Sequence, residues 1–173
     1  MFYFRRVFII ITIILLLFCS YSCVKPEKKY IDTIALYADR YGVDPYLVLA
    51  IAYVESGFDA KAVSPVGAMG VMQIMPATGE WIAGLLGVEC REDFLMDPDI
   101  NIQIGTYYLS YLSMRFADDW QVYAAYNAGE TAVYGWLEKG IGRKSIPYEE
   151  TKEYVSKVER ARKRFSAKKI FAF

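Results

Sequence analysis

The feature that most constrains this chain is a run of nine apolar residues, 46–54, that ends in a single carboxylate, Glu55. Asp44 and Pro45 precede the run as a helix-start signal, because the Asp side chain accepts from free backbone N–H groups and Pro tolerates the first helical position. Gly57 is the matching stop signal. The sequence therefore predicts a helix that begins at Pro45 and ends just before Gly57. Its sides are apolar all round, which is typical of a helix buried at the centre of a domain.

Glu55 is expected in the last turn of this helix, where two effects raise the pKa of a carboxyl group. The C-terminal end of a helix carries partial negative charge, and apolar neighbours disfavour ionisation by desolvation. A carboxyl that stays protonated near neutral pH is what a general acid requires, and glycoside cleavage is a common chemistry for it. The alternative is that Glu55 simply reaches solvent from the helix end.

Composition narrows the class of protein. The 173 residues suit one domain with a real core, and 55% hydrophobic with 23% charged content is typical of a globular chain. Basic and acidic residues balance at 20 each, which gives no argument for a nucleic-acid partner. Histidine is absent, which excludes His-based triads and imidazole metal sites, so we expect no metal and no cofactor. The three cysteines imply no disulfide framework.

The N-terminus has the layout of an export signal. Arg5 and Arg6 precede an apolar run over residues 7–18, so residues 1–23 are predicted to be a signal peptide or an uncleaved signal anchor. Cys23 after a small residue loosely resembles a bacterial lipoprotein processing site, which makes lipid attachment, an anchor and release three open outcomes. Residues 24–29 form a polar tether. We expect an extracytoplasmic domain, held at a membrane in the first two cases.

The rest of the chain is predicted to be mainly α, because apolar residues recur at helical spacing between start and stop signals and no convincing alternating strand appears. Residues 58–75 show no period, and their glycines suggest a loop whose backbone approaches something closely. The expected helices are Tyr30–Tyr41, Pro45–Ser56, a stretch from Pro76 closed by Gly87, Pro98 to about Phe116, Asp119–Ala128, Thr131–Lys139 and about Glu149 to Phe165.

Several blocks occur in one order along residues 30–165 and together resemble a known family. The blocks are Glu55-Ser-Gly-Phe58, Ala62-Val-Ser64, Gly67-Ala-Met-Gly70-Val-Met-Gln73-Ile-Met-Pro76-Ala-Thr78, Asp97-Pro98, Asn101-Ile102, Ala124-Ala-Tyr126-Asn-Ala-Gly129 and Pro147-Tyr-Glu-Glu150-Thr-Lys-Glu-Tyr154-Val155. They resemble the catalytic domain of the soluble-type lytic transglycosylases (the SLT domain, similar to glycoside hydrolase family 23). The resemblance implies a single lysozyme-like domain of the goose-type lysozyme kind, with a substrate groove.

The resemblance also implies the chemistry. Glu55 would be the single catalytic residue, acting first as general acid and then as base, and would cleave the β-1,4 bond between N-acetylmuramic acid and N-acetylglucosamine in peptidoglycan. The product would be a 1,6-anhydromuramoyl end formed without water. Lysozyme-type hydrolysis of the same bond is an alternative that needs Asp59 or Glu150 to position water. A glycan-binding module without catalysis is the other alternative.

The remaining site residues carry over from the family. They are Ser64, Gln73, Met75, Tyr126, Asn127, Glu150 and Tyr154, which the resemblance places in or near the substrate groove. The expected partners are peptidoglycan glycan strands and a membrane reached through the N-terminal segment, and the protein is expected to be a monomer. Lys157 to Lys169 hold seven basic residues and one acid, which indicates a solvated helix face or attraction to an anionic polymer or lipid headgroups. Residues 166–173 are a basic and apolar tail.

Overall fold

The computed structural model describes residues 26–88 and 91–171. The expected signal segment, Cys23 and Cys90 lie outside these residues. The expected tether is described only from Pro26, where the chain forms a short 3-10 helix. Among the described residues, no helix is both long and apolar enough to cross a membrane.

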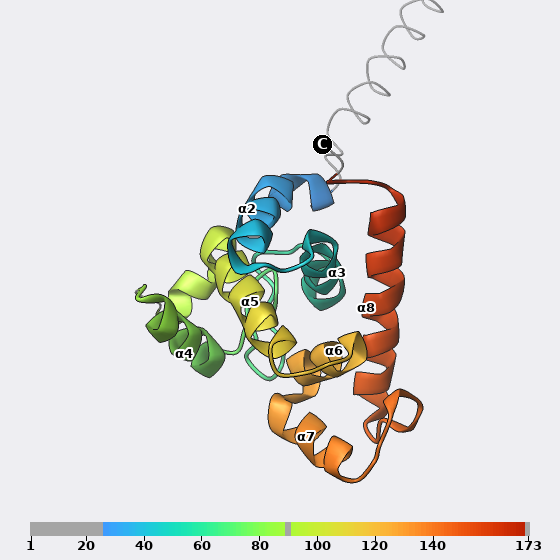
Figure 1. The fold of residues 1–173 in the computed structure, drawn as a ribbon. Helices are drawn as coiled ribbons and strands as arrows, with labels where there is room; N and C mark the ends of the chain where they lie inside the picture. The colour runs from blue at the N-terminus through green and yellow to red at the C-terminus, as the bar shows by residue number, and fades with distance from the viewer. Residues whose placement is uncertain (1–25, 89–90, 172–173) are drawn as a thin grey trace, which may run out of the picture.

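The described chain is built from helices, which confirms the mainly α prediction (Figure 1). No β-strand occurs in it, apart from isolated bridges at Val63–Met69 and Met69–Ile74. The elements are η1 (Pro26–Tyr30), α2 (Ile31–Tyr41), α3 (Pro45–Ser56), α4 (Pro76–Leu86), η2 (Glu92–Met96), α5 (Pro98–Ser113), α6 (Asp119–Ala128), α7 (Glu130–Glu138), η3 (Arg143–Ser145) and α8 (Glu149–Ala167).

Helix α3 occupies the centre of the domain, with the boundaries that its capping signals predict. The Asp44 side chain accepts a hydrogen bond from the backbone N–H of Tyr46 at 3.0 Å, and Gly57 ends the helix with φ of 61°. Residues 47–52 are all buried. The helix packs against α2, α5 and α8, and Figure 1 shows it enclosed between them. Most of the apolar surface of α3 is therefore covered by neighbouring helices, and Tyr53 stays 40% exposed.

Helix α8 is fixed to α3 and α6 by one arginine as well as by apolar packing. Arg162 donates from Nε to Asp44 at 2.7 Å, and from Nη1 to Asp119 at 2.6 Å and to the Tyr123 hydroxyl at 2.7 Å. Because Asp44 also caps α3, this network sets the start of α3 against the last two turns of α8. The opposite end of α3, which carries Glu55, is then placed along α8 by the rigidity of the two helices.

The glycine-rich loop between α3 and α4 is held by a fully buried amide. Asn101 accepts from the backbone N–H of Met72 at 2.7 Å, and its Nδ2 donates to the carbonyls of Met69 and Leu95, each at 2.9 Å. Gly70 packs onto this amide with φ of 76°, and a Cβ there would lie 2.4 Å from Asn101 Nδ2. The close backbone approach expected from the glycines is therefore present at Gly70.

The helix ends differ from the predictions by a few residues. Helix α5 stops at Ser113 although apolar spacing continues to Phe116, and α7 begins one residue early at Glu130. The 3-10 helix η2 was not predicted, since five residues are too few to show a period. Helix α8 continues to Ala167, and beyond it the ring of Phe171 packs on Tyr46 at 5.1 Å between centroids.

Candidate active site

Glu55 lies at the C-terminal end of α3, and its carboxyl group is paired with a hydroxyl from α8. Tyr154 donates a hydrogen bond to Oε1 of Glu55 at 2.6 Å. Tyr154 is buried, whereas Glu55 is partly exposed. Within the described part of the chain, Oε2 of Glu55 receives no hydrogen bond. One carboxyl oxygen is thus held by the protein, and the other is free to meet a ligand.

Burial raises the pKa of Glu55 toward neutral pH. Desolvation raises the pKa of Glu55 from 4.5 to about 7, and the hydrogen bond from Tyr154 opposes this by stabilising the carboxylate. A pKa near the ambient pH lets one carboxyl group give a proton and take one back without a large penalty in either direction. The side chain is therefore suited to act as both acid and base.

Tyr126 lies close enough to Glu55 for the carboxylate to raise its pKa further above the value that burial already gives. Its hydroxyl donates to the backbone carbonyl of Met72 at 2.9 Å. The pKa of Tyr154 is likewise raised well above 10, first by burial and then by the charge of Glu55. Both phenols therefore stay protonated at neutral pH and act as donors.

Ser56, next to Glu55, joins α3 to the glycine-rich loop. Its hydroxyl donates to the carbonyl of Val71 at 2.7 Å and accepts from the backbone N–H of Asp59 at 3.1 Å. Together with Asn101 it fixes the loop beside the carboxyl group. No role for Ser56 or Asn101 was predicted from the sequence, although both lie inside the blocks that carry the family resemblance.

Two of the loop residues expected to bind substrate use part of their polar groups to hold the loop itself. The Ser64 hydroxyl oxygen accepts from the backbone N–H of Ala68 at 2.9 Å. Gln73 has a positive φ of 50°, and its Nε2 donates to the carbonyls of Ala62 at 3.1 Å and Gly70 at 3.0 Å. The Ser64 proton and the Gln73 side-chain oxygen remain for a ligand. The expected role of Ser64 and Gln73 in substrate binding stays a prediction.

Met75, at the start of α4, leaves 41% of its surface exposed, so its thioether is available to pack against a sugar face. That role too stays a prediction.

Two further residues expected at the site, Asn127 and Glu150, lie at or beside the first turn of α8. Asn127 accepts from the buried hydroxyl of Thr151 at 2.8 Å, which ties the end of α6 to the first turn of α8. Glu150 is exposed and lies four residues before Tyr154, so it shares that side of the helix. Among the described residues, no hydrogen bond joins the carboxyl groups of Glu150 and Glu55.

Asp59, considered above as a second carboxylate, closes a turn. Its Oδ1 accepts from the backbone N–H of Lys61 at 2.8 Å, and the residue is exposed. That contact matches the turn pattern in which an Asp side chain bonds the backbone two residues on.

Comparisons with known proteins show which family this chain is similar to. The family model described as the transglycosylase SLT domain matches residues 32–147. The soluble lytic murein transglycosylase of Escherichia coli (strain K12) is 37% identical over 140 residues, which cover 75% of this chain and 22% of that protein. The membrane-bound lytic murein transglycosylase C of Edwardsiella ictaluri is 36% identical over 126 residues, covering 63% of this chain and 33% of the relative.

A solved structure gives the same result for the fold. The lytic transglycosylase Slt of Pseudomonas aeruginosa, solved as an inactive glutamate-to-glutamine mutant, superposes with a TM-score of 0.75 at 32% identity. The match covers 79% of this chain and 24% of that one. The lysozyme-like architecture expected from the sequence is thereby confirmed. The chain spans between a fifth and a third of the length of these relatives.

Proposed function

Because this chain belongs to the transglycosylase SLT domain family, we propose that it is a peptidoglycan lytic transglycosylase in which Glu55 is the catalytic residue. The observation that carries the proposal is a carboxyl group with a pKa of about 7, held through one oxygen by Tyr154, whose other oxygen receives no hydrogen bond from the described residues. The relatives bear the name of this activity, and the Pseudomonas aeruginosa structure is described as inactive when a glutamate becomes glutamine.

The reaction needs two proton transfers at one group. Protonated Glu55 gives its proton to the glycosidic oxygen as the bond from that oxygen to C1 of the muramic acid residue breaks. The 2-acetamido oxygen of the same sugar stabilises the positive charge that develops at C1. The C6 hydroxyl then attacks C1, and its proton passes to the Glu55 carboxylate. The 1,6-anhydro ring forms, Glu55 is again protonated, and no water is consumed.

Tyr154 supports both steps as a positioning residue. Its hydroxyl donates to Oε1 of Glu55, so the transferable proton belongs on Oε2, which receives no hydrogen bond from the described residues. When Glu55 is ionised after the first step, the same hydrogen bond stabilises the carboxylate until it takes the second proton.

Hydrolysis in the manner of lysozyme is less well supported by the geometry. It needs a second carboxylate positioned near the scissile bond to activate water or to act as nucleophile. The Asp59 side chain is exposed and closes a turn with the backbone of Lys61, so it is occupied by its own loop. Glu150, which is exposed on the same side of α8 as Tyr154, is assigned to substrate binding. The same raised pKa of Glu55 argues against a binding module without catalysis, since binding a glycan needs no such group.

The expected location follows from the sequence rather than from the described fold. Arg5, Arg6 and the apolar run over residues 7–18 support export, and the name of the Edwardsiella ictaluri relative includes membrane attachment. The proposal is an extracytoplasmic monomer that acts on glycan strands, attached by a lipid on Cys23 or by an uncleaved signal anchor.

The test is mass spectrometry of the fragments that the full chain, purified in a neutral detergent, releases from purified peptidoglycan. Wild type is expected to release anhydromuropeptides, and Glu55→Gln is expected to lower the rate by several orders of magnitude because it removes the carboxylic acid that gives its proton to the glycosidic oxygen. Fragments heavier by one water would assign the reaction to a lysozyme. Substantial cleavage by Glu55→Gln would show that Glu55 is not the catalytic residue.

A further inference from the structure

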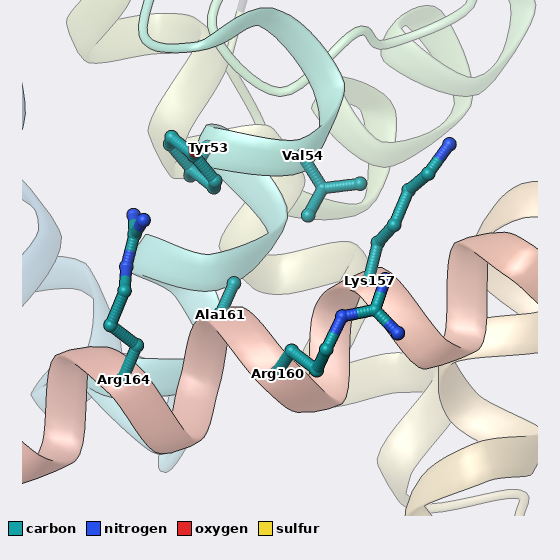
Figure 2. Close-up of a pocket in the computed structure, with 6 residues that line it drawn as sticks. All are labelled: Tyr53, Val54, Lys157, Arg160, Ala161 and Arg164. Carbon is teal, nitrogen blue, oxygen red and sulfur yellow. The ribbon is translucent and has the colours of Figure 1, made fainter.

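A cationic hollow lies in the seam between α3 and α8, on the side of α3 that carries Tyr53. It has a volume of about 400 Å³. We call it the α3–α8 pocket, and its lining residues are Tyr53, Val54, Lys157, Arg160, Ala161 and Arg164 (Figure 2). Figure 2 shows Lys157 and Arg164 extending upward from α8, Arg160 lying along that helix, and Tyr53 and Val54 on α3 above α8 in this view. The lining contains three cations and no carboxylate.

The cations of the pocket are only weakly neutralised by the protein. Arg160 makes no ion pair and no side-chain hydrogen bond to any of the described residues. Lys157 has one acidic partner, Glu153, at 3.7 Å, and both side chains are more than half exposed, so the pair contributes little. A second anion could therefore be bound without displacing a strong internal partner.

The aromatic wall orients the third cation. The guanidinium of Arg164 lies over the ring of Tyr53 at 4.5 Å and over that of Phe165 at 4.8 Å. Stacking uses the faces of the guanidinium and leaves the N–H groups at its edge for an acceptor. Tyr53 is 40% exposed, so its ring also offers an apolar surface beside the charge. The pocket thus suits a ligand that combines carboxylates with short aliphatic segments.

The pocket starts next to the catalytic pair on both helices. Val54 precedes Glu55 in α3, and Lys157 follows Tyr154 by three residues, or about one helical turn. The far end, at Arg164, is ten residues beyond Tyr154, or roughly 15 Å along the helix axis. An extended peptide of four residues spans roughly 13 to 14 Å. A tetrapeptide attached to a sugar at Glu55 is therefore long enough to extend along most of the pocket.

We propose that the α3–α8 pocket binds the carboxylates of the acidic stem peptide that peptidoglycan carries on its muramic acid residues. This inference rests on the proposed function, which supplies the sugar at Glu55. It assigns to this surface a preference for peptide-bearing strands over strands without peptides. A pocket of this volume holds one or two amino-acid residues. A membrane is a broad surface, and it would be contacted by a convex face of the protein more readily than by a pocket.

The test is direct binding of a soluble muramoyl stem peptide to the full chain in neutral detergent, measured by calorimetry. The same peptide with its carboxylates converted to amides is the ligand control. Arg160→Gln is the main variant, because Arg160 makes no contact that holds the fold. Lys163→Gln, also exposed on α8 but outside the pocket, is the matched protein control. Thermal unfolding checks that both variants fold like wild type.

We expect Arg160→Gln to weaken binding of the acidic peptide by roughly three- to tenfold and Lys163→Gln to leave it unchanged. Amidation of the ligand should weaken binding to wild type by at least as much and remove the difference between wild type and Arg160→Gln. Equal binding of the acidic and amidated peptides, or equal binding by wild type and Arg160→Gln, would overturn the proposal. So would a variant that keeps full peptide affinity but binds less tightly to vesicles containing phosphatidylglycerol, because the pocket would then face a membrane.

Steady-state kinetics distinguish peptide binding by the pocket from the proposed transglycosylase activity, on which the inference rests. On peptide-bearing strands Arg160→Gln should raise KM by a similar factor with kcat unchanged, and on strands stripped of peptides it should match wild type. An increase in KM on both substrates would overturn a peptide-specific role. If wild type formed no anhydro product at all, the proposed function would fail, while the calorimetric result would still decide whether the pocket binds the acidic peptide.

Discussion

The hydroxyl of Tyr154 lies 2.6 Å from Oε1 of Glu55, although the two residues are 99 positions apart in the chain. This hydrogen bond is one of two opposing influences on the pKa of Glu55, and burial is the other. Burial raises the pKa, and the donated hydrogen bond lowers it, with a result of about 7.

Activity should decline on the alkaline side of neutrality. Glu55 must be protonated at the start of the cycle, so kcat/KM is expected to be constant well below pH 7 and to fall about tenfold per pH unit above it. The measurement is the initial rate of anhydromuropeptide release as a function of pH. A rate that stays constant to pH 9 would contradict the assigned acid.

Loss of the carboxyl group should stabilise the fold at high pH. Because the pKa of Glu55 is raised from 4.5 to about 7, the folded protein binds more protons than the unfolded chain between these values. The free energy of unfolding of wild type therefore falls as pH rises through this window. Glu55→Gln should match wild type near pH 4.5 and exceed it by about 1 to 3 kcal/mol at pH 8. Urea unfolding at both pH values measures this, and a difference independent of pH would contradict it.

Removal of the Tyr154 hydroxyl should move the pH profile. Tyr154→Phe takes away the donor that favours the Glu55 carboxylate, so the alkaline limb of kcat/KM is expected to shift upward by about one pH unit. The maximal rate should also fall, because Glu55 is less firmly oriented. Tyr134→Phe, at an exposed position of α7, is the control and should leave the profile in place. A lower rate with an unmoved pH profile would indicate a purely structural role for Tyr154.

The glycine-rich loop should tolerate no side chain at Gly70. A Cβ there would lie 2.4 Å from both Asn101 Nδ2 and the Leu95 carbonyl oxygen, and φ is positive. Gly70→Ala is therefore expected to lower the free energy of unfolding by at least about 2 kcal/mol and to reduce activity by displacing the loop. Gly84→Ala, in α4 with open space around it, should instead be neutral or stabilise by up to about 1 kcal/mol. Chemical denaturation of both variants makes the comparison, and equal effects would refute the role of close packing.

The partly buried hydrogen bond between Asn127 and Thr151 should contribute to stability, whereas the hydroxyl of a second buried threonine, Thr106, should not. Thr151→Val removes the donor and leaves the Asn127 oxygen unpaired, which is expected to cost about 1 to 2 kcal/mol. Thr106 is also fully buried, but its hydroxyl has no partner among the described residues. Thr106→Val should therefore be neutral or stabilising. Denaturation curves for the two variants test this, and equal destabilisation would argue that the loss of the hydroxyl matters only through packing.

The sequence by itself determined the central helix and its end. Asp44, Pro45 and Gly57 act within one or two turns of the backbone, so the limits of α3 and the place of Glu55 in its last turn could be predicted from local chemistry alone. The raised pKa of Glu55 followed as well, because it depends mainly on burial, which an unbroken apolar run already indicates.

Only the tertiary structure decided which groups meet. Nothing local distinguishes Tyr154 from other tyrosines at helical spacing, and its pairing with Glu55 exists because α8 packs across α3. The clamp of Asn101 on the loop and the gathering of Lys157, Arg160 and Arg164 beside Tyr53 arise in the same way. Caps and periodicity fix a helix through neighbours in sequence, whereas a hydrogen-bond partner or a pocket depends on how distant helices are oriented, and that orientation is set by the packing of the whole core.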